Sequence, residues 1–188
     1  MEKVISMIKV CTKSFTEQSG RFKHQTEHQA GLDLIGQMLR EMYGIDFCLI
    51  KKDERGKPYL SSHPDIYISI SHSHGCAACA VGDRPLGVDV EKIRPYAEKI
   101  WCKVLNPREQ QILTDAALTK KERQELFYRF WTLKESYVKA EGCGFCIPPQ
   151  EITFVLDRDG TVISGPEGYQ FQVKKVRGSY MTASCQKT

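Results

Sequence analysis

Glu135 and Lys139 place an acid and a base four residues apart in a run that favours a helix, residues 130–139. Residues four apart share one face of a helix, so the two side chains would lie one turn apart. A lysine in that place can give positive charge, or a proton, to a departing anionic group. The spacing therefore predicts acid–base chemistry at one helix face.

Two further carboxylates, Asp89 and Glu91, alternate with valines in a strand-like segment, residues 87–91. The period of two in a strand directs both carboxylates to one side and the valines to the core. Together with Glu135 they form an all-oxygen set, which favours Mg²⁺ or Mn²⁺ over zinc. Magnesium keeps open positions for water and phosphate oxygens, so the residues predict a phosphoryl-type transfer.

Other interpretations of these residues stay open. Acidic residues at a strand end and Glu/Lys pairs on a helix are routine surface features, worth roughly 0.2–0.5 kcal/mol per pair. A Mg²⁺-dependent nuclease or phosphohydrolase also holds its metal with alternating acids on a strand. Such nucleases usually place a lysine two residues after an acid, and this chain has Ile93 there.

The eight cysteines include two pairs at the CxxC spacing, Cys76/Cys79 and Cys143/Cys146, which is compatible with a thiol or zinc module. The first pair lies in a strand-like apolar run, where a separation of three directs the two side chains to opposite faces. Buried free thiols are the favoured interpretation of that pair.

The order of predicted elements occurs twice along the chain. Helical periodicity over residues 22–43 ends at Gly44, and the turn at 56–59 follows from its Gly and Pro. Later, Asn106-Pro107-Arg108-Glu109 has the pattern of a capped helix start, and the long helix 119–141 ends before Gly142. Strands are expected at 3–10, 47–51, 65–71, 76–82, 86–91, 151–156, 169–177 and 179–185.

Composition and charge limit the function classes. A chain of 188 residues with 41% hydrophobic content can bury a sizeable core. The net charge of +4 suits an anionic small molecule or an acidic partner protein, and falls short of a nucleic-acid footprint. We expect no membrane span, because no apolar stretch reaches about 18 residues, and no signal peptide, so a cytoplasmic protein.

Four blocks in order carry a resemblance to a known family. They are Gly56-Lys57-Pro58, Ile70-Ser71-His72-Ser73, residues 87–91 and residues 131–139. Together they resemble the signature of the 4′-phosphopantetheinyl transferases, of the long, pseudo-dimeric surfactin-synthetase type. The resemblance runs from residue 20 to the end of the chain.

The resemblance implies a reaction and a set of roles. The family moves the phosphopantetheine arm of coenzyme A onto a serine of a carrier protein, releases adenosine 3′,5′-bisphosphate and uses Mg²⁺. By the match, Asp89, Glu91 and Glu135 hold the metal, Glu135 helps to deprotonate the serine, and Lys139 protonates the leaving phosphate. The residues expected at the phosphates of coenzyme A are Lys57, Ser71, His72, Lys134, Lys139, Arg21 and His24. This chain departs from the family pattern at Ser69, where an asparagine is common, and at Gln29, where an arginine is usual.

The resemblance also implies an α/β (α+β) fold of two similar, pseudo-twofold-related halves, 1–85 and 86–188. Each half would pack a long helix on a small, mainly antiparallel sheet. Coenzyme A would lie in the cleft between the halves, and an acyl or peptidyl carrier protein would dock beside it. A duplicated chain needs no second copy, so a monomer is expected.

Overall fold

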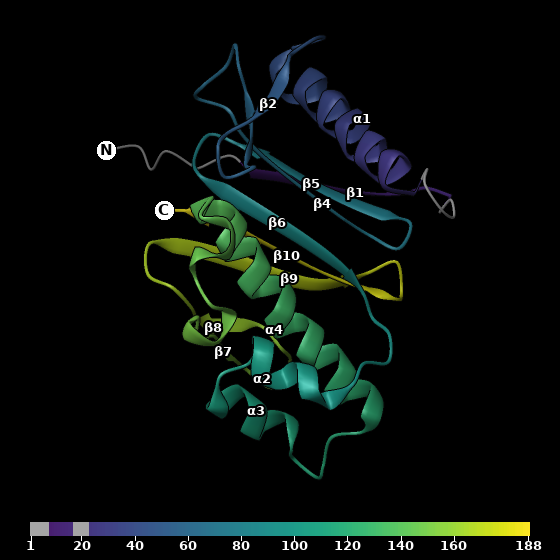
Figure 1. Cartoon of the computed structure of the whole chain (residues 1–188), viewed down its shortest axis with the longest axis vertical. Helices are drawn as coiled ribbons and strands as arrows, with labels where there is room; N and C mark the ends of the chain where they lie inside the picture. The colour runs from purple at the N-terminus through teal and green to yellow at the C-terminus, as the bar shows by residue number, and fades with distance from the viewer. Residues whose placement is uncertain (1–7, 17–22) are drawn as a thin grey trace.

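The computed structural model describes residues 8–16 and 23–188. Its first sheet contains three antiparallel strands (Figure 1). Its order is β1 (Ile8–Ser14), β5 (Cys76–Gly82) and β4 (Tyr67–Ser73). Helix α1 (Lys23–Tyr43) packs on this sheet through Leu34, Ile35, Met38 and Leu39, which meet Ile68, Cys79 and Val81. A short hairpin, β2 (Ile50–Lys52) and β3 (Pro58–Leu60), connects α1 to β4.

The second sheet has the same strand order as the first when the strands of each sheet are counted along the chain. Its central strand is β10 (Tyr180–Lys187), which pairs antiparallel with β6 (Leu86–Lys92) on one side and with β9 (Tyr169–Val176) on the other. In each sheet the third strand along the chain lies in the centre, between the first and the second. Helix α4 (Lys120–Glu141) packs on this second sheet (Figure 1).

Short elements complete the second core. Between β6 and α4 lie η2 (Glu98–Ile100), α2 (Trp101–Val104) and α3 (Pro107–Leu113). After α4 come η3 (Gly144–Cys146), η4 (Pro149–Glu151), β7 (Val155–Leu156) and β8 (Val162–Ser164). Their apolar residues join those of α4 in one cluster that includes Leu105, Leu113, Phe127, Phe130 and Leu133.

Capping groups fix the starts of α3 and α4 and the end of α4. Asn106 caps α3 and Thr119 caps α4, each in a reciprocal capping box with Glu109 or Glu122. Helix α4 ends at Gly142, whose φ of 65° is a left-handed conformation that glycine adopts without strain. The boundaries predicted from the caps are therefore confirmed.

Gly87 brings β6 against α4. A Cβ atom at this position would lie 1.9 Å from the backbone oxygen of Ser136 and 2.6 Å from the backbone nitrogen of Ala140. Only a residue without a side chain permits this approach. It places Asp89, two residues further along β6, beside the helix turn that carries Glu135 and Lys139.

The predicted mixture of helices and antiparallel strands is confirmed, with differences at particular strands. The strand expected at 3–10 runs over residues 8–14 as described, and residues 3–7 lie outside the described part of the chain. The expected strand 47–51 is shorter and later, at 50–52. The strands β3 and β8, of three residues each, were not predicted, because so few residues carry no readable alternation. The pseudo-twofold relation between halves stays a prediction.

Over residues 8–16 and 23–188, the structure contains no helix with both the length and the apolar character needed to cross a bilayer.

Candidate functional site

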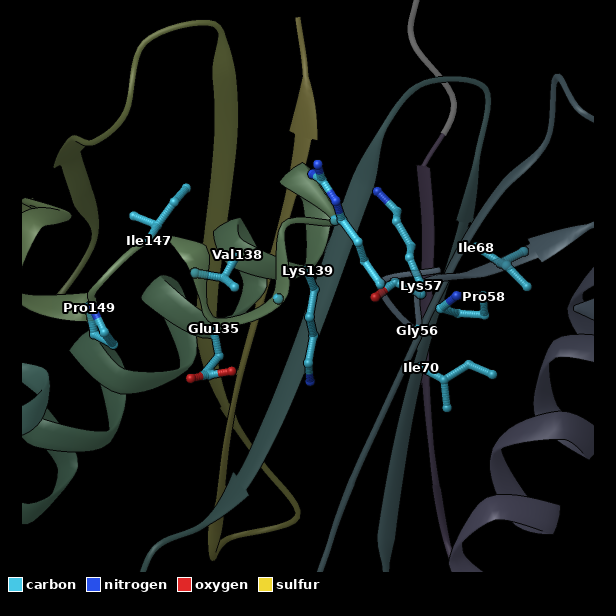
Figure 2. Close-up of a pocket in the computed structure, with 14 residues that line it drawn as sticks. Gly56, Lys57, Pro58, Ile68, Ile70, Glu135, Val138, Lys139, Ile147 and Pro149 are labelled. Atoms are coloured by element: carbon cyan, nitrogen blue, oxygen red, sulfur yellow. The ribbon is translucent and has the colours of Figure 1, made fainter. Parts of the chain in front are cut away.

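A cavity of about 270 Å³ lies between the segment that carries β3 and β4 and the C-terminal end of α4. Figure 2 shows Glu135, Val138 and Lys139 on the α4 side and Gly56, Lys57, Pro58, Ile68 and Ile70 on the other. Ile147 and Pro149, which follow α4, also line it. The cavity therefore draws its lining from residues 55–70 and 135–149, two segments far apart in the sequence.

Asp89 is the most deeply buried of the predicted metal ligands, with 3% of its surface exposed. Its Oδ1 accepts hydrogen bonds from Ser71 Oγ at 2.8 Å and from Lys139 Nζ at 2.7 Å. Its Oδ2 is buried and has no partner among the described residues. A buried carboxylate oxygen without a donor is costly, and a bound cation would satisfy it.

Glu91 and Glu135 lie in the electrostatic field of Asp89. Burial raises the pKa of Glu91 to about 7, and the charge of Asp89 adds to that rise, while Ser73 and Lys139 lower the pKa. Burial and the charge of Asp89 also raise the pKa of Glu135 above its usual range. Asp89 thus repels both glutamates, and a cation among the three carboxylates would relieve that repulsion.

The donor set fits magnesium better than zinc. Among the described residues, no three His, Cys, Asp or Glu side chains are already grouped as a metal cluster. Magnesium needs no such cage, because it is usually held by one or two carboxylates together with waters and substrate phosphates. The unpartnered Oδ2 of Asp89 is the observation that supports this fit.

Lys57 reaches from the loop between β2 and β3 to α4. Its ammonium group donates to the backbone oxygen of Ala140, near the end of that helix. Burial lowers the pKa of Lys57. The loop that carries it is held by Asp53, whose Oδ1 accepts from the backbone nitrogens of Arg55 at 2.9 Å and Lys57 at 2.8 Å. Lys57 also lines the cavity, and its contact with phosphate groups stays a prediction.

Ser71 and His72 lie on β4, and neither lines the cavity. The buried hydroxyl of Ser71 donates to Asp89 and accepts from the backbone nitrogen of Val90 at 3.3 Å. His72 Nδ1 lies 3.2 Å from Oε2 of Glu27, a buried residue of α1. A contact of either residue with phosphate groups stays a prediction.

The structure corrects the role expected of Lys134. Its side chain is buried, and its Nζ donates to Glu109 Oε2 at 2.5 Å, Val104 O at 2.8 Å and Pro149 O at 2.9 Å. All its proton donors face this enclosed cluster, so it does not reach the cavity. Lys134 instead joins α4 to α2, α3 and η4.

The residues expected ahead of the first helix are described only in part. Arg21 lies outside the described residues. His24 lies in the first turn of α1, and the structure describes its backbone but not its side chain. Gln29, on the same helix, donates from Nε2 to Asp33 Oδ1 at 2.7 Å.

The cysteines of the first CxxC pair lie on opposite faces of β5, as predicted. Cys79 Sγ donates to the backbone oxygen of Gly31 in α1 at 3.4 Å. Cys76 packs on the other face with Val88 and Val90 of β6. The two sulfur atoms thus belong to different clusters, which does not suit joint binding of one zinc ion.

Sequence reasoning gave Ser69 and Ser73 no role at the site. In the structure Ser73 Oγ donates to Glu91 Oε2 at 2.7 Å, and Ser69 Oγ accepts from the backbone nitrogen of Val88 at 3.1 Å. The signal was present in the sequence, since serine recurs at 69, 71 and 73 with the same period of two as the acids at 89 and 91.

Comparison with known proteins gives a consistent result. Residues 85–185 match the model of the 4′-phosphopantetheinyl transferase superfamily. A 4′-phosphopantetheinyl transferase of Bacillus subtilis is 35% identical over 162 residues, which cover 82% of this chain and 70% of that protein. The 4′-phosphopantetheinyl transferase Sfp of Bacillus subtilis strain 168 is 32% identical over 180 residues, covering 90% of this chain and 79% of that protein.

Among solved structures, the holo-[acyl-carrier-protein] synthase of Thermotoga maritima aligns with a TM-score of 0.44 and 21% identity. The alignment covers 55% of this chain and 64% of that one.

Proposed function

Because this chain belongs to the 4′-phosphopantetheinyl transferase superfamily, we propose that it transfers the phosphopantetheine arm of coenzyme A to a serine of a carrier protein, with Mg²⁺ and release of adenosine 3′,5′-bisphosphate. The observation that carries the proposal is the cavity that brings Glu135, Lys139 and Lys57 together. Lys139 binds Oδ1 of Asp89, and the other carboxylate oxygen, Oδ2, has no partner among the described residues.

The proposed metal ligands are Asp89, Glu91 and Glu135. When bound, Mg²⁺ would neutralise the charge of the pyrophosphate. The buried position of Asp89 supports a fixed ligand, because its Oδ1 is already held by two donors and only Oδ2 remains. Glu91 is held in turn by Ser73.

Glu135 and Lys139 divide the proton transfers between them. Glu135, directly or through a water, takes the proton from the serine hydroxyl of the carrier protein. The serine oxygen then forms a bond to the phosphorus that carries the pantetheine arm, and the bond from that phosphorus to the bisphosphate oxygen breaks. Lys139 supplies positive charge and a proton to the departing phosphate. Their positions one turn apart on α4, at the same cavity, support this division.

Cationic groups beside the cavity would bind the phosphates of coenzyme A. Lys57 lines the cavity, and its ammonium group would exchange the backbone oxygen of Ala140 for a phosphate oxygen. Ser71, His72, Arg21 and His24 are proposed as further contacts on the resemblance alone.

We further propose that residues 1–85 and 86–188 are two halves related by a pseudo-twofold axis. The shared strand order of the two sheets, each covered by one long helix, supports that division. Because the cavity is lined from both halves of one chain, a second copy is not needed, and we propose a monomer. The net charge of +4 would favour an acidic carrier protein.

The test is the intact mass of an apo acyl or peptidyl carrier protein after incubation with this protein and coenzyme A, with and without Mg²⁺. We expect a gain of one phosphopantetheine that requires Mg²⁺, and one equivalent of adenosine 3′,5′-bisphosphate. A panel of acyl and peptidyl carriers removes carrier preference as a cause of failure, so no gain with any carrier would refute the proposal.

A further inference from the structure

Strands β4 and β6 lie side by side but belong to different sheets, and serine side chains connect them. Ser69, Ser71 and Ser73, here called the serine row, occupy alternate positions of β4 and are all buried. Their hydroxyl oxygens accept hydrogen bonds from the backbone nitrogens of β6, at 3.1 Å for Val88, 3.3 Å for Val90 and 3.3 Å for Lys92.

The serine row meets a need of the edge strand β6. That strand pairs with β10 on one side only. Alternate residues of an edge strand direct their N–H groups away from the partner strand, and such groups are costly when buried without an acceptor. The hydroxyl oxygens of the serine row take the place of the backbone carbonyl groups of a neighbouring strand.

Two members of the row also hold carboxylates. A serine hydroxyl has one proton to donate and two lone pairs that accept. Ser71 gives its proton to Asp89 Oδ1 at 2.8 Å, and Ser73 gives its proton to Glu91 Oε2 at 2.7 Å. For Ser69, which lines the cavity, the structure shows only the bond it accepts from Val88.

His74 completes the bonding of Ser73. Its Nδ1 lies 3.1 Å from Ser73 Oγ. When Glu91 is ionised, as it would be with a metal bound, the single proton of Ser73 goes to Glu91, so the histidine is the donor in this contact and carries a proton on Nδ1. Ser73 Oγ then donates once and accepts twice, so the orientation of its hydroxyl group is fixed.

We propose that Ser71 and Ser73 are positioning residues, which lock β4 to β6 and fix the orientations of the Asp89 and Glu91 carboxylates for the metal. This inference rests on the proposed function, because it takes both acids as metal ligands. Ser71 orients one Asp89 oxygen so that the unpartnered Oδ2 is the one left for the cation. Donors of this kind behind metal ligands typically contribute 10–100-fold to metal affinity.

Ser69 supplies a matched control within the same strand. Ser69→Ala removes a bond to a β6 nitrogen and no bond to a carboxylate, whereas Ser71→Ala and Ser73→Ala remove both. Amide hydrogen exchange by NMR reports the backbone bonds. Mn²⁺ titration by electron paramagnetic resonance, with coenzyme A present, reports the metal site.

In the exchange experiment, we expect each alanine variant to reduce the protection of its own amide, Val88, Val90 or Lys92, by about fivefold or more. In the titration, Ser71→Ala and Ser73→Ala should weaken Mn²⁺ binding by about tenfold or more, and Ser69→Ala by less than twofold. Ser71→Thr and Ser73→Thr keep the hydroxyl and should restore both measurements.

Unchanged Mn²⁺ affinity in Ser71→Ala and Ser73→Ala would overturn the positioning role. Unchanged amide protection in all three variants would overturn the connection between the strands. If the unaltered protein binds no Mn²⁺, the metal role in the proposed function is refuted instead. The exchange experiment still tests whether the serine row connects β4 to β6. Where an alanine variant does not fold, cysteine at that position keeps the shape of serine with a somewhat larger atom and weakens the donor, and the same criteria apply.

Discussion

Lys139 Nζ lies 2.7 Å from Asp89 Oδ1 and joins the last turns of α4 to the middle of β6. The lysine side chain is 30% exposed and that of the aspartate 5%. The cation is therefore reachable from the cavity, while the anion is enclosed. The ammonium group of Lys139 can therefore turn toward a ligand in the cavity while Asp89 stays shielded from water.

Lys139→Met should reduce phosphopantetheine transfer by at least about 100-fold, because it removes the charge and the proton proposed for the leaving phosphate. Steady-state turnover measures the effect. Lys175→Met is the matched control, since Lys175 of β9 is as exposed as Lys139, at 30%, and forms an ion pair with Glu125 of α4. Its turnover should stay within twofold, and an equal loss in both variants would contradict the assignment.

Glu135→Gln keeps the shape of the side chain and removes its charge. Loss of a general base costs about 10²–10⁴-fold, so transfer should fall to near the detection limit. Circular dichroism should show an unchanged fold. Glu125→Gln, on the same helix, should have normal turnover, and near-normal turnover of Glu135→Gln would refute its role as base and ligand.

Lys134→Met should destabilise the protein by about 3–5 kcal/mol, because the buried carboxylate of Glu109 loses the lysine with which it forms an ion pair. The double variant Lys134→Met/Glu109→Leu should recover part of that loss, since no uncompensated charge remains. The free energy of unfolding in urea measures both. An effect on turnover without a loss of stability would instead support the phosphate role expected from the sequence.

Gly87→Ala tests the close approach of β6 and α4. Its Cβ would lie 1.9 Å from a backbone oxygen, so helix and strand must separate, at a cost of about 1–3 kcal/mol or more. Gly36→Ala in α1 meets no atom within 4 Å and should stabilise by about 0.5–1 kcal/mol. Thermal unfolding should therefore shift in opposite directions, and a neutral Gly87→Ala would show that the approach is not tight.

Thiol labelling at pH 8 should separate the cysteines by burial. Cys102 and Cys146 are exposed and should react in the native protein. Cys79 and Cys185 are buried, and burial raises the pKa of each thiol to about 12, so the reactive thiolate is scarce. They should react only on unfolding in urea. Rapid native labelling of Cys79 would contradict its place between β5 and α1.

The elements with clear local signals were predicted well. Strand β5 has the predicted bounds, 76–82, and α4 begins one residue after the predicted start because Thr119 is its cap. These signals are local, since a short apolar run and a capping pattern depend only on residues that are neighbours in the sequence.

The parts that were not predicted depend on packing between distant segments. Lys134 was expected at the phosphates because it is next to Glu135 in the sequence. Adjacent residues lie about 100° apart around a helix, and the sequence could not show that α2, α3 and η4 cover the side of α4 that carries Lys134. The sequence likewise shows the serine row as three serines at alternate positions, 69, 71 and 73. Its role was not visible, because side-chain bonds between strands of different sheets have no local signature.

The central position of β10 has a consequence for the synthesis of the protein. Strands β6 and β9 are both paired to β10 and not to each other, so neither has a strand partner in this sheet until residues 180–187 have left the ribosome. The first sheet is complete once β5 has emerged, about a hundred residues earlier in the chain. While the ribosome makes the intervening residues, the serine row of β4 can already accept the hydrogen bonds of the β6 backbone. The folded first sheet can then serve as the template on which the second sheet is assembled.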